Sequence, residues 1–155
     1  MRVFKGEGRL ALIVTVVLAV LIMGGCAATM KYSYDTRTDF SGLKSYGWVP
    51  SSVTYVGAGS LLETNVRVLA DQSLEQKGFT KVPGKSDLLI SMNYESEASS
   101  SQYGYQLRTL TLNIYKSEQK ELIWQGTASG SIRTDAASGD LKRVVQSILS
   151  KFPPK

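Results

Sequence analysis

The residues that could carry covalent chemistry are few. The chain contains no histidine and a single cysteine, Cys26, so a Ser-His-Asp triad, an imidazole metal site and a histidine general base are excluded. Ser41 and Lys44 are close enough in sequence to suggest a serine nucleophile with a lysine base. Both residue types are common at surfaces, however, and their spacing does not require catalysis. The sequence therefore predicts a domain that is not an enzyme.

Two short motifs could hold a ligand, and each departs from its pattern at an important position. The segment Asp35-Thr36-Arg37-Thr38-Asp39 offers oxygens at alternating positions, as calcium loops do, yet Arg37 would repel the metal. Gly57-Ala58-Gly59 before a helix resembles a dinucleotide fingerprint, but Leu62 stands where the third glycine belongs. We expect a turn with a local ion pair in the first motif and a hinge in the second. Neither a metal nor another cofactor is expected.

Cys26 has the clearest chemistry, because an export signal precedes it. Three basic residues make a positively charged start, and an apolar run extends from Leu10 to Met23. As a helix this run would rise about 21 Å, short of the roughly 30 Å of hydrocarbon that a permanent span must cross. We therefore predict that residues 1–25 form a cleaved signal peptide.

The residues around the cleavage position indicate lipid attachment. Met23-Gly24-Gly25-Cys26 resembles the lipobox of bacterial lipoproteins, although such proteins more often carry leucine at the position of Met23. The alternative for Cys26, a small buried apolar residue, fits poorly after a hydrophobic run and two glycines. Acylation of Cys26 would make membrane binding effectively permanent. In Gram-negative lipoproteins an aspartate at the next position favours the inner membrane, so Ala27 predicts an outer-membrane anchor on the periplasmic face.

The mature chain has the size and charge of one small globular domain. Removing the signal leaves 130 of 155 residues, and taking its three basic and one acidic residue from totals of 18 and 13 leaves a net charge of +3. This charge is mild and scattered, so we expect no nucleic-acid partner. We predict a lipidated N-terminus and tether over residues 26–33 and one domain over residues 34–155.

Periodic apolar residues predict the elements of this domain. A first strand leads to Trp48, and a helix runs from the capping box Ser60-Leu61-Leu62-Glu63 to Gly78. Alternation predicts a strand over 88–95 and a hairpin of strands 107–115 and 121–129 with an exposed polar tip. Asp140 can cap a last helix, whose apolar stripe is Leu141, Val144, Val145, Ile148, Leu149 and Phe152. We expect an α+β fold with a small, mostly antiparallel sheet of four to five strands and two amphipathic helices on one face.

Several short motifs, taken in order, are similar to a known family. They are Tyr34-Asp35, Asp39-Phe40-Ser41, Lys44-Ser45-Tyr46-x-Trp48, Leu74-x-x-Lys77-Gly78-Phe79, Asp87-Leu88-Leu89-Ile90, Leu122-Ile123-Trp124-x-Gly126 and Phe152-Pro153-Pro154. The chain resembles DUF4136, a domain of unknown function in bacterial envelope lipoproteins. The resemblance implies a small α+β envelope domain and no activity, because the family has none assigned. Such proteins often carry an acid at the tip of the last hairpin, where this chain has Lys116-Ser117-Glu118-Gln119-Lys120.

Aromatic residues are the remaining candidates for a binding surface. Trp48 and Trp124 could form a stacking platform for a sugar or peptide, although large aromatics on strands are more often core residues. Tyr103 and Tyr105, beside a serine-rich stretch, could form an exposed aromatic edge for a partner. We therefore predict an envelope lipoprotein, held to the membrane through Cys26, that is a non-enzymatic binding or structural module for an envelope protein or ligand. A carrier of a lipid or small apolar ligand, and a Ser/Lys hydrolase, are the alternatives.

Overall fold

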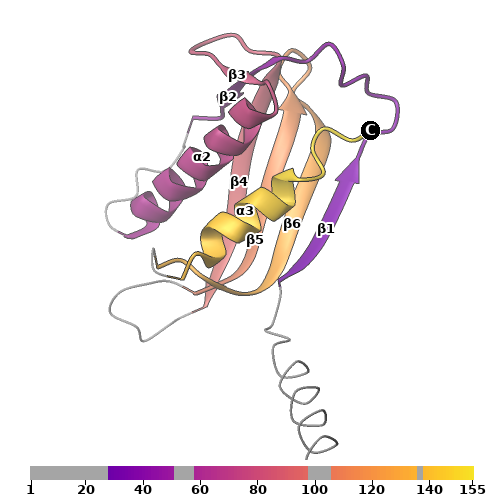
Figure 1. The fold of residues 1–155 in the computed structure, drawn as a ribbon. Coiled ribbons are helices and arrows are strands. Elements are labelled where there is room, and N and C mark those ends of the chain that lie inside the picture. The colour runs from indigo at the N-terminus through magenta and orange to yellow at the C-terminus, as the bar shows by residue number, and fades with distance from the viewer. Residues whose placement is uncertain (1–27, 51–57, 98–105, 136–137) are drawn as a thin grey trace, which may run out of the picture.

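Six strands form one sheet, and two helices lie across one of its faces (Figure 1). The structure is a computed structural model that describes residues 28–50, 58–97, 106–135 and 138–155. The strands are β1 (Thr29–Tyr34), β2 (Ser45–Trp48), β3 (Thr80–Lys81), β4 (Leu88–Glu97), β5 (Gln106–Lys116) and β6 (Glu121–Arg133), and the helices are α2 (Ala58–Gln76) and α3 (Asp140–Leu149).

The sheet is mixed, with the strand order β1-β6-β5-β4-β2-β3. The pairs β1–β6, β6–β5 and β5–β4 are antiparallel, whereas β2 pairs parallel with both β4 and β3. The α+β class and the two helices on one face are confirmed. The strand count is larger than the four to five expected, because both edges of the sheet carry a strand that the sequence pattern did not reveal.

One of these edge strands lies in the segment that was expected to be a tether. β1 pairs over all six residues with β6, and it begins three residues after Cys26. Met30, Tyr32 and Tyr34 alternate with polar residues and lie on the helix-covered face of the sheet by their register with β6. Because β1 forms the margin of the sheet, five of its six side chains stay exposed. The domain therefore begins at β1 and not at residue 34.

Helix α2 packs an apolar stripe against the sheet. Leu62, Val66, Ala70 and Leu74 are buried, while Leu69 is half-buried. The helix begins at Ala58, two residues before the expected cap. Gly78 ends it as predicted, with a φ of 87° that a residue with a side chain rarely adopts.

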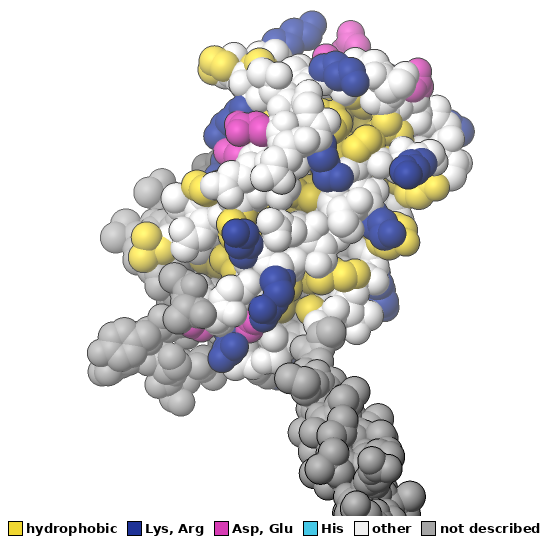
Figure 2. Space-filling view, in the orientation of Figure 1, with side chains coloured by type: hydrophobic (Ala, Val, Ile, Leu, Met, Phe, Trp, Pro, Cys, Tyr) yellow, Lys and Arg dark blue, Asp and Glu magenta, His cyan; other side chains and the backbone are white. Residues whose placement is uncertain are grey.

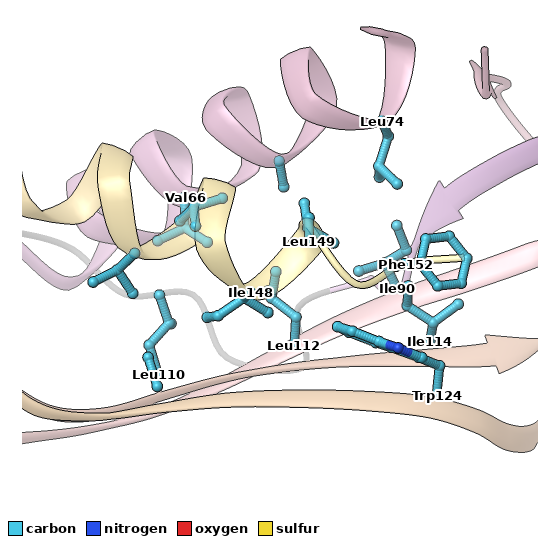
Figure 3. Close-up of a cluster of buried hydrophobic side chains, with 14 of the residues drawn as sticks. Val66, Leu74, Ile90, Leu110, Leu112, Ile114, Trp124, Ile148, Leu149 and Phe152 are labelled. Carbon is cyan, nitrogen blue, oxygen red and sulfur yellow. The ribbon is translucent and has the colours of Figure 1, made fainter. Parts of the chain in front are cut away.

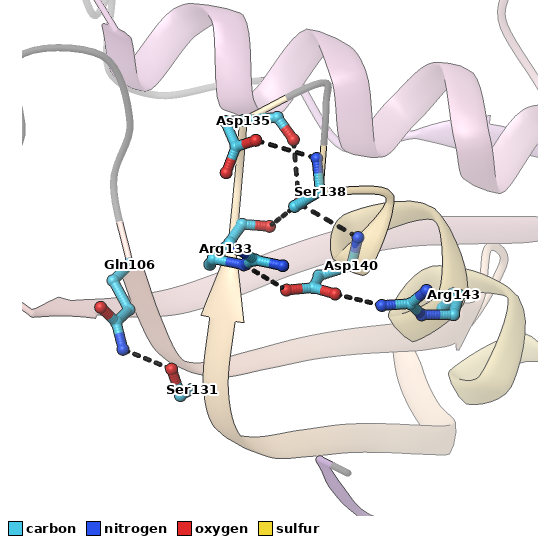
Figure 4. Close-up of polar contacts among 7 residues, drawn as sticks. All are labelled: Gln106, Ser131, Arg133, Asp135, Ser138, Asp140 and Arg143. Atoms are coloured by element: carbon cyan, nitrogen blue, oxygen red, sulfur yellow. Dashed lines mark hydrogen bonds and ion pairs between the residues drawn. The ribbon is translucent and has the colours of Figure 1, made fainter. Parts of the chain in front are cut away.

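Helix α3 also buries its predicted stripe, but a different residue forms its N-terminal cap. Asp140 is the first helical residue, and Gly139 holds the cap position with a φ of 65° and no side-chain hydrogen bond. The carboxylate of Asp140 instead pairs with Arg133 Nε at 3.0 Å and with Arg143 (Figure 4). Gly139 has no side chain that could accept a hydrogen bond, and the hydroxyl of the preceding Ser138 accepts the Asp140 backbone N–H at 3.2 Å.

The core fills the space between the helices and the sheet (Figure 3). The predicted hairpin of β5 and β6 is confirmed, and its residues 118–120 are exposed. Leu110, Leu112 and Ile114 of β5 are fully buried beneath the helices, as their alternation predicts. On the outside of the helix-bearing face, Lys and Arg side chains are scattered among hydrophobic ones (Figure 2). Within the described ranges, neither helix is long and apolar enough to span a membrane.

Candidate functional site

A pocket of about 400 Å³ opens at the end of the sheet where β1 finishes. We call it the end pocket. Three separate parts of the chain build it: the segment after β1, the end of α2, and the C-terminal residues after α3. Its lining residues are Tyr34, Asp35, Thr36, Thr38, Asp39, Phe40, Ser41, Lys44, Lys77, Phe79, Pro153, Pro154 and Lys155. In Figure 1 the C-terminus lies beside the segment that follows β1.

The floor of the end pocket is aromatic and continuous with the core. Phe152 is fully buried, and its ring lies 5.3 Å from that of Phe79 and 6.0 Å from that of Phe40, centroid to centroid. Trp124 contacts Phe152 from below, edge to face, at 5.4 Å. Because Phe152 is locked in the core, it holds Pro153 and Pro154 at the pocket.

The segment after β1 folds on itself through its own carboxylates. Asp35 accepts hydrogen bonds from the backbone N–H of Arg37 at 3.2 Å, from Arg37 Nε at 3.0 Å and from the Thr38 hydroxyl at 3.1 Å. These bonds, above all the one from the Arg37 side chain, lower the pKa of Asp35. Hydrogen bonds from Ser41 likewise lower the pKa of Asp39. The prediction of a turn with a local ion pair is thus confirmed.

Asp87, which directly precedes β4, binds the end of this segment at Lys44 and Ser45. One of its carboxylate oxygens accepts the backbone N–H groups of Lys44 at 3.0 Å and Ser45 at 2.8 Å, and the Ser45 hydroxyl at 2.8 Å. The first of these contacts contributes most to a lowered pKa of Asp87. The carboxylate positions Lys44 at the rim of the pocket.

We expect the Asp87 contacts to stabilise the fold only while the carboxylate is charged. Because folding lowers its pKa, the contribution is present above the unfolded value of about 4 and is lost as the pH falls through the folded value. Asp87→Asn should lower the free energy of unfolding by about 1 kcal/mol at neutral pH and by much less at pH 3. Urea denaturation at both pH values measures this, and an equal loss at both would contradict it.

Only some of the charged side chains that line the end pocket have a partner of opposite charge. Asp35 is paired with Arg37, whereas Lys44, Lys77 and Lys155 have no carboxylate partner among the described residues. Ser41 and Lys44 both line the pocket, but the structure has no hydrogen bond between the serine hydroxyl and the lysine ammonium, which a nucleophile and its base would need. The described residues also contain no cluster of metal-ligating side chains.

The two tryptophans proposed as a binding surface are both engaged within the fold. Trp124 is 1% exposed, so it is a core residue, and its indole N–H has no hydrogen-bond partner among the described residues. Trp48 is half-buried; its indole N–H donates to Asp71 Oδ1 at 2.8 Å, and the Arg67 guanidinium lies 4.8 Å from the centre of its ring. Neither forms an open stacking platform. Tyr103, Tyr105 and Cys26 lie outside the described residues.

Comparison with known protein families shows which family the chain belongs to. Residues 30–154 match the domain of unknown function DUF4136. The chain belongs to the DUF4136 family. No curated protein sequence matches it. The family name carries no activity, so the structure has to indicate where a function lies.

Solved structures similar to this DUF4136 chain support its fold. A DUF4136 family protein from Bacteroides thetaiotaomicron has a TM-score of 0.59 and 12% identity, covering 83% of this chain and 97% of that one. A PDZ domain protein from Parabacteroides distasonis has a TM-score of 0.63 and 16% identity over 83% of this chain, which spans only 36% of that protein. A PelC dodecamer from Paraburkholderia phytofirmans has a TM-score of 0.57 and 13% identity, covering 79% of this chain and 95% of that one.

The motifs that carry the DUF4136 resemblance converge on one end of the domain. Five of them, which begin at Tyr34, Asp39, Lys44, Leu74 and Phe152, contribute residues to the end pocket or its floor. Asp87 anchors its rim, and the segment around Trp124 supports its floor. Sequence reasoning did not find this pocket, because its walls come from positions more than a hundred residues apart.

Proposed function

We propose that this DUF4136 protein is an outer-membrane lipoprotein whose domain is a non-enzymatic binding module, with the end pocket as its binding site. The observation that carries the proposal is the position of β1 between the expected lipid anchor and the pocket. β1 begins three residues after Cys26, and its last residue, Tyr34, lines the pocket. The position of β1 would therefore determine both how far the domain lies from the membrane and which way the end pocket faces.

The geometry supports a short and directional attachment. Three residues span at most about 10 Å, so a lipid on Cys26 would hold the start of β1 close to the membrane surface. The strand then rises about 3.3 Å per residue, which places Tyr34 roughly 17 Å from Thr29. A pocket at that end would open away from the membrane, where a partner or ligand in the periplasm can reach it.

The alternatives are less well supported. A carrier of an apolar ligand would need room between the helices and the sheet, but fully buried side chains such as Val66, Leu112 and Val145 fill that space. A hydrolase would need Ser41 and Lys44 in contact, and the structure has no hydrogen bond between them. A binding role for the end pocket requires neither an internal cavity nor contact between Ser41 and Lys44.

The first test of this proposal is the mass and location of the protein extracted from membranes. We expect a species that starts at Cys26 and carries a diacylglyceryl group and an amide-linked acyl chain, and that separates with the outer membrane on a density gradient. Cys26→Ala should abolish both the added mass and the membrane association. An unprocessed mass in both proteins would contradict the anchor, and turnover of a substrate on a hydrolase panel would contradict the non-enzymatic role.

A further inference from the structure

The end pocket combines positive charge that is not neutralised with an apolar wall. Lys44, Lys77 and Lys155 reach it from three separate parts of the chain, and all three are exposed. Among the described residues no carboxylate pairs with any of them. A ligand with a negative charge could therefore bind these ammonium groups without displacing an existing ion pair.

The two acids in the lining do not cancel this charge. Asp35 is held by the Arg37 side chain, by a backbone N–H and by a hydroxyl, so its charge is already compensated within the loop. Asp39 accepts the backbone N–H of Ser41 at 2.9 Å. Counting Arg37 with Asp35, the lining keeps the ammonium groups of three lysines against two carboxylates, those of Asp39 and of the C-terminus at Lys155. The balance is still positive, which favours an anion.

The apolar part of the lining determines what else the ligand needs. Tyr34 is 42% exposed although it is aromatic, and Phe40 and Pro154 are half-buried. These side chains give the pocket flat surfaces on which a ring can pack. The volume of about 400 Å³ lies in the lower part of the range of small-molecule sites. A bare inorganic ion would leave most of this surface unused.

We infer that the end pocket binds a small anionic ligand, in which a carboxylate or phosphate contacts Lys44, Lys77 and Lys155 and a ring or other apolar body packs on Tyr34, Phe40 and Pro154. This inference rests on the proposed role of the pocket as a binding site and adds the chemical class of the ligand. The lysines select the charge of the ligand, and the aromatic and proline residues select its body.

Titration of the lipidated protein in detergent micelles, followed by NMR of its backbone amides, tests this inference. The probes are phenyl phosphate, benzoate, benzylamine and inorganic phosphate. We expect saturable shifts at the amides of Thr38, Lys44 and Phe79 with phenyl phosphate and benzoate. Inorganic phosphate should bind more weakly, and benzylamine should cause no saturable shift there. The tighter of the two aromatic anions identifies a phosphate-bearing or a carboxylate-bearing ligand.

Two lysine variants and a matched control make the test specific. Lys44→Ala and Lys77→Ala should each weaken binding of the better anion about two- to fivefold, since each removes one exposed charge contact. Lys142→Ala removes the same charge from the exposed face of α3, outside the pocket lining, and should leave binding unchanged. The amide spectrum of each variant shows whether it is folded.

Three results would overturn the inference: no saturable shift with either aromatic anion, equal binding of benzylamine, or an equal loss of affinity in Lys142→Ala. None of them would alter the acyl mass on Cys26 or the membrane location of the protein. Failure of the ligand class is therefore distinguishable from failure of the proposed anchor.

Discussion

Replacing Gly126 with alanine is expected to lower the free energy of unfolding by about 3 kcal/mol. Gly126 lies on β6 two residues after Trp124, on the face covered by the helices. A Cβ at this position would lie 2.3 Å from Trp124 Cη2 and 2.7 Å from Ile148 Cγ2. Both neighbours are buried, so the methyl group would force the indole or helix α3 to move. Urea denaturation followed by tryptophan fluorescence measures the loss.

Two further variants show whether crowding is the cause. Gly42→Ala is the matched control, because nothing lies within 4 Å of a Cβ built there, and its effect should stay within about 0.5 kcal/mol. In the double variant Gly126→Ala with Trp124→Phe, the smaller ring makes room for the methyl group. We expect the double variant to lose less stability than the sum of its single changes. Strict additivity, or a Gly126→Ala protein as stable as the wild type, would contradict this account.

The elements that the sequence predicted well are those that bury a face. Helix α3 repeats apolar residues with a helical period from Leu141 to Phe152, and every member of the stripe is buried. The alternation of Leu110, Leu112 and Ile114 likewise identified β5. Burial imposes a period on the sequence, so such patterns can be read without a structure.

The edge strands were missed for the same physical reason. β1 buries almost nothing, so its alternation of Met30, Tyr32 and Tyr34 with polar residues is a weak signal, and the sequence predicts a tether up to residue 33. β3 contains only two residues, Thr80 and Lys81, both exposed, and two residues show no period. The signal for β1 was present in its alternation, but nothing in the local sequence shows that β6 offers it a partner.

The candidate site was less predictable than the fold. Each residue type in the end pocket is ordinary, and only the fold brings Tyr34, Lys77 and Pro154 together. The prediction for the tryptophans left core and platform open; Trp124 is a core residue, and Trp48 is held by Asp71 and Arg67. The lipid anchor at Cys26 stays a prediction from sequence.

Asp71 carries the second large expected effect, because it joins α2 to the parallel part of the sheet. Its Oδ1 accepts the Tyr46 hydroxyl at 3.0 Å and the Trp48 indole N–H at 2.8 Å, while its Oδ2 contacts Lys81 Nζ at 2.8 Å. Tyr46 is fully buried, so its hydroxyl would lose its acceptor in Asp71→Ala without gaining water. We expect Asp71→Ala to lower the free energy of unfolding by about 3 kcal/mol, measured by urea denaturation at neutral pH.

Comparison of single and double variants separates the Tyr46 contact from the rest of this cluster. Tyr46→Phe removes only the hydroxyl, and combining it with Asp71→Ala should cost less than the two single changes together, because no buried hydroxyl is then left unpaired. Burial raises the pKa of Tyr46, and so does the contact with Asp71. Wild-type stability should therefore fall as the pH rises above about 10, the unfolded value, and Tyr46→Phe should fall less steeply. Identical alkaline profiles would mean that water reaches the tyrosine hydroxyl and that Asp71 does not stabilise its protonated form.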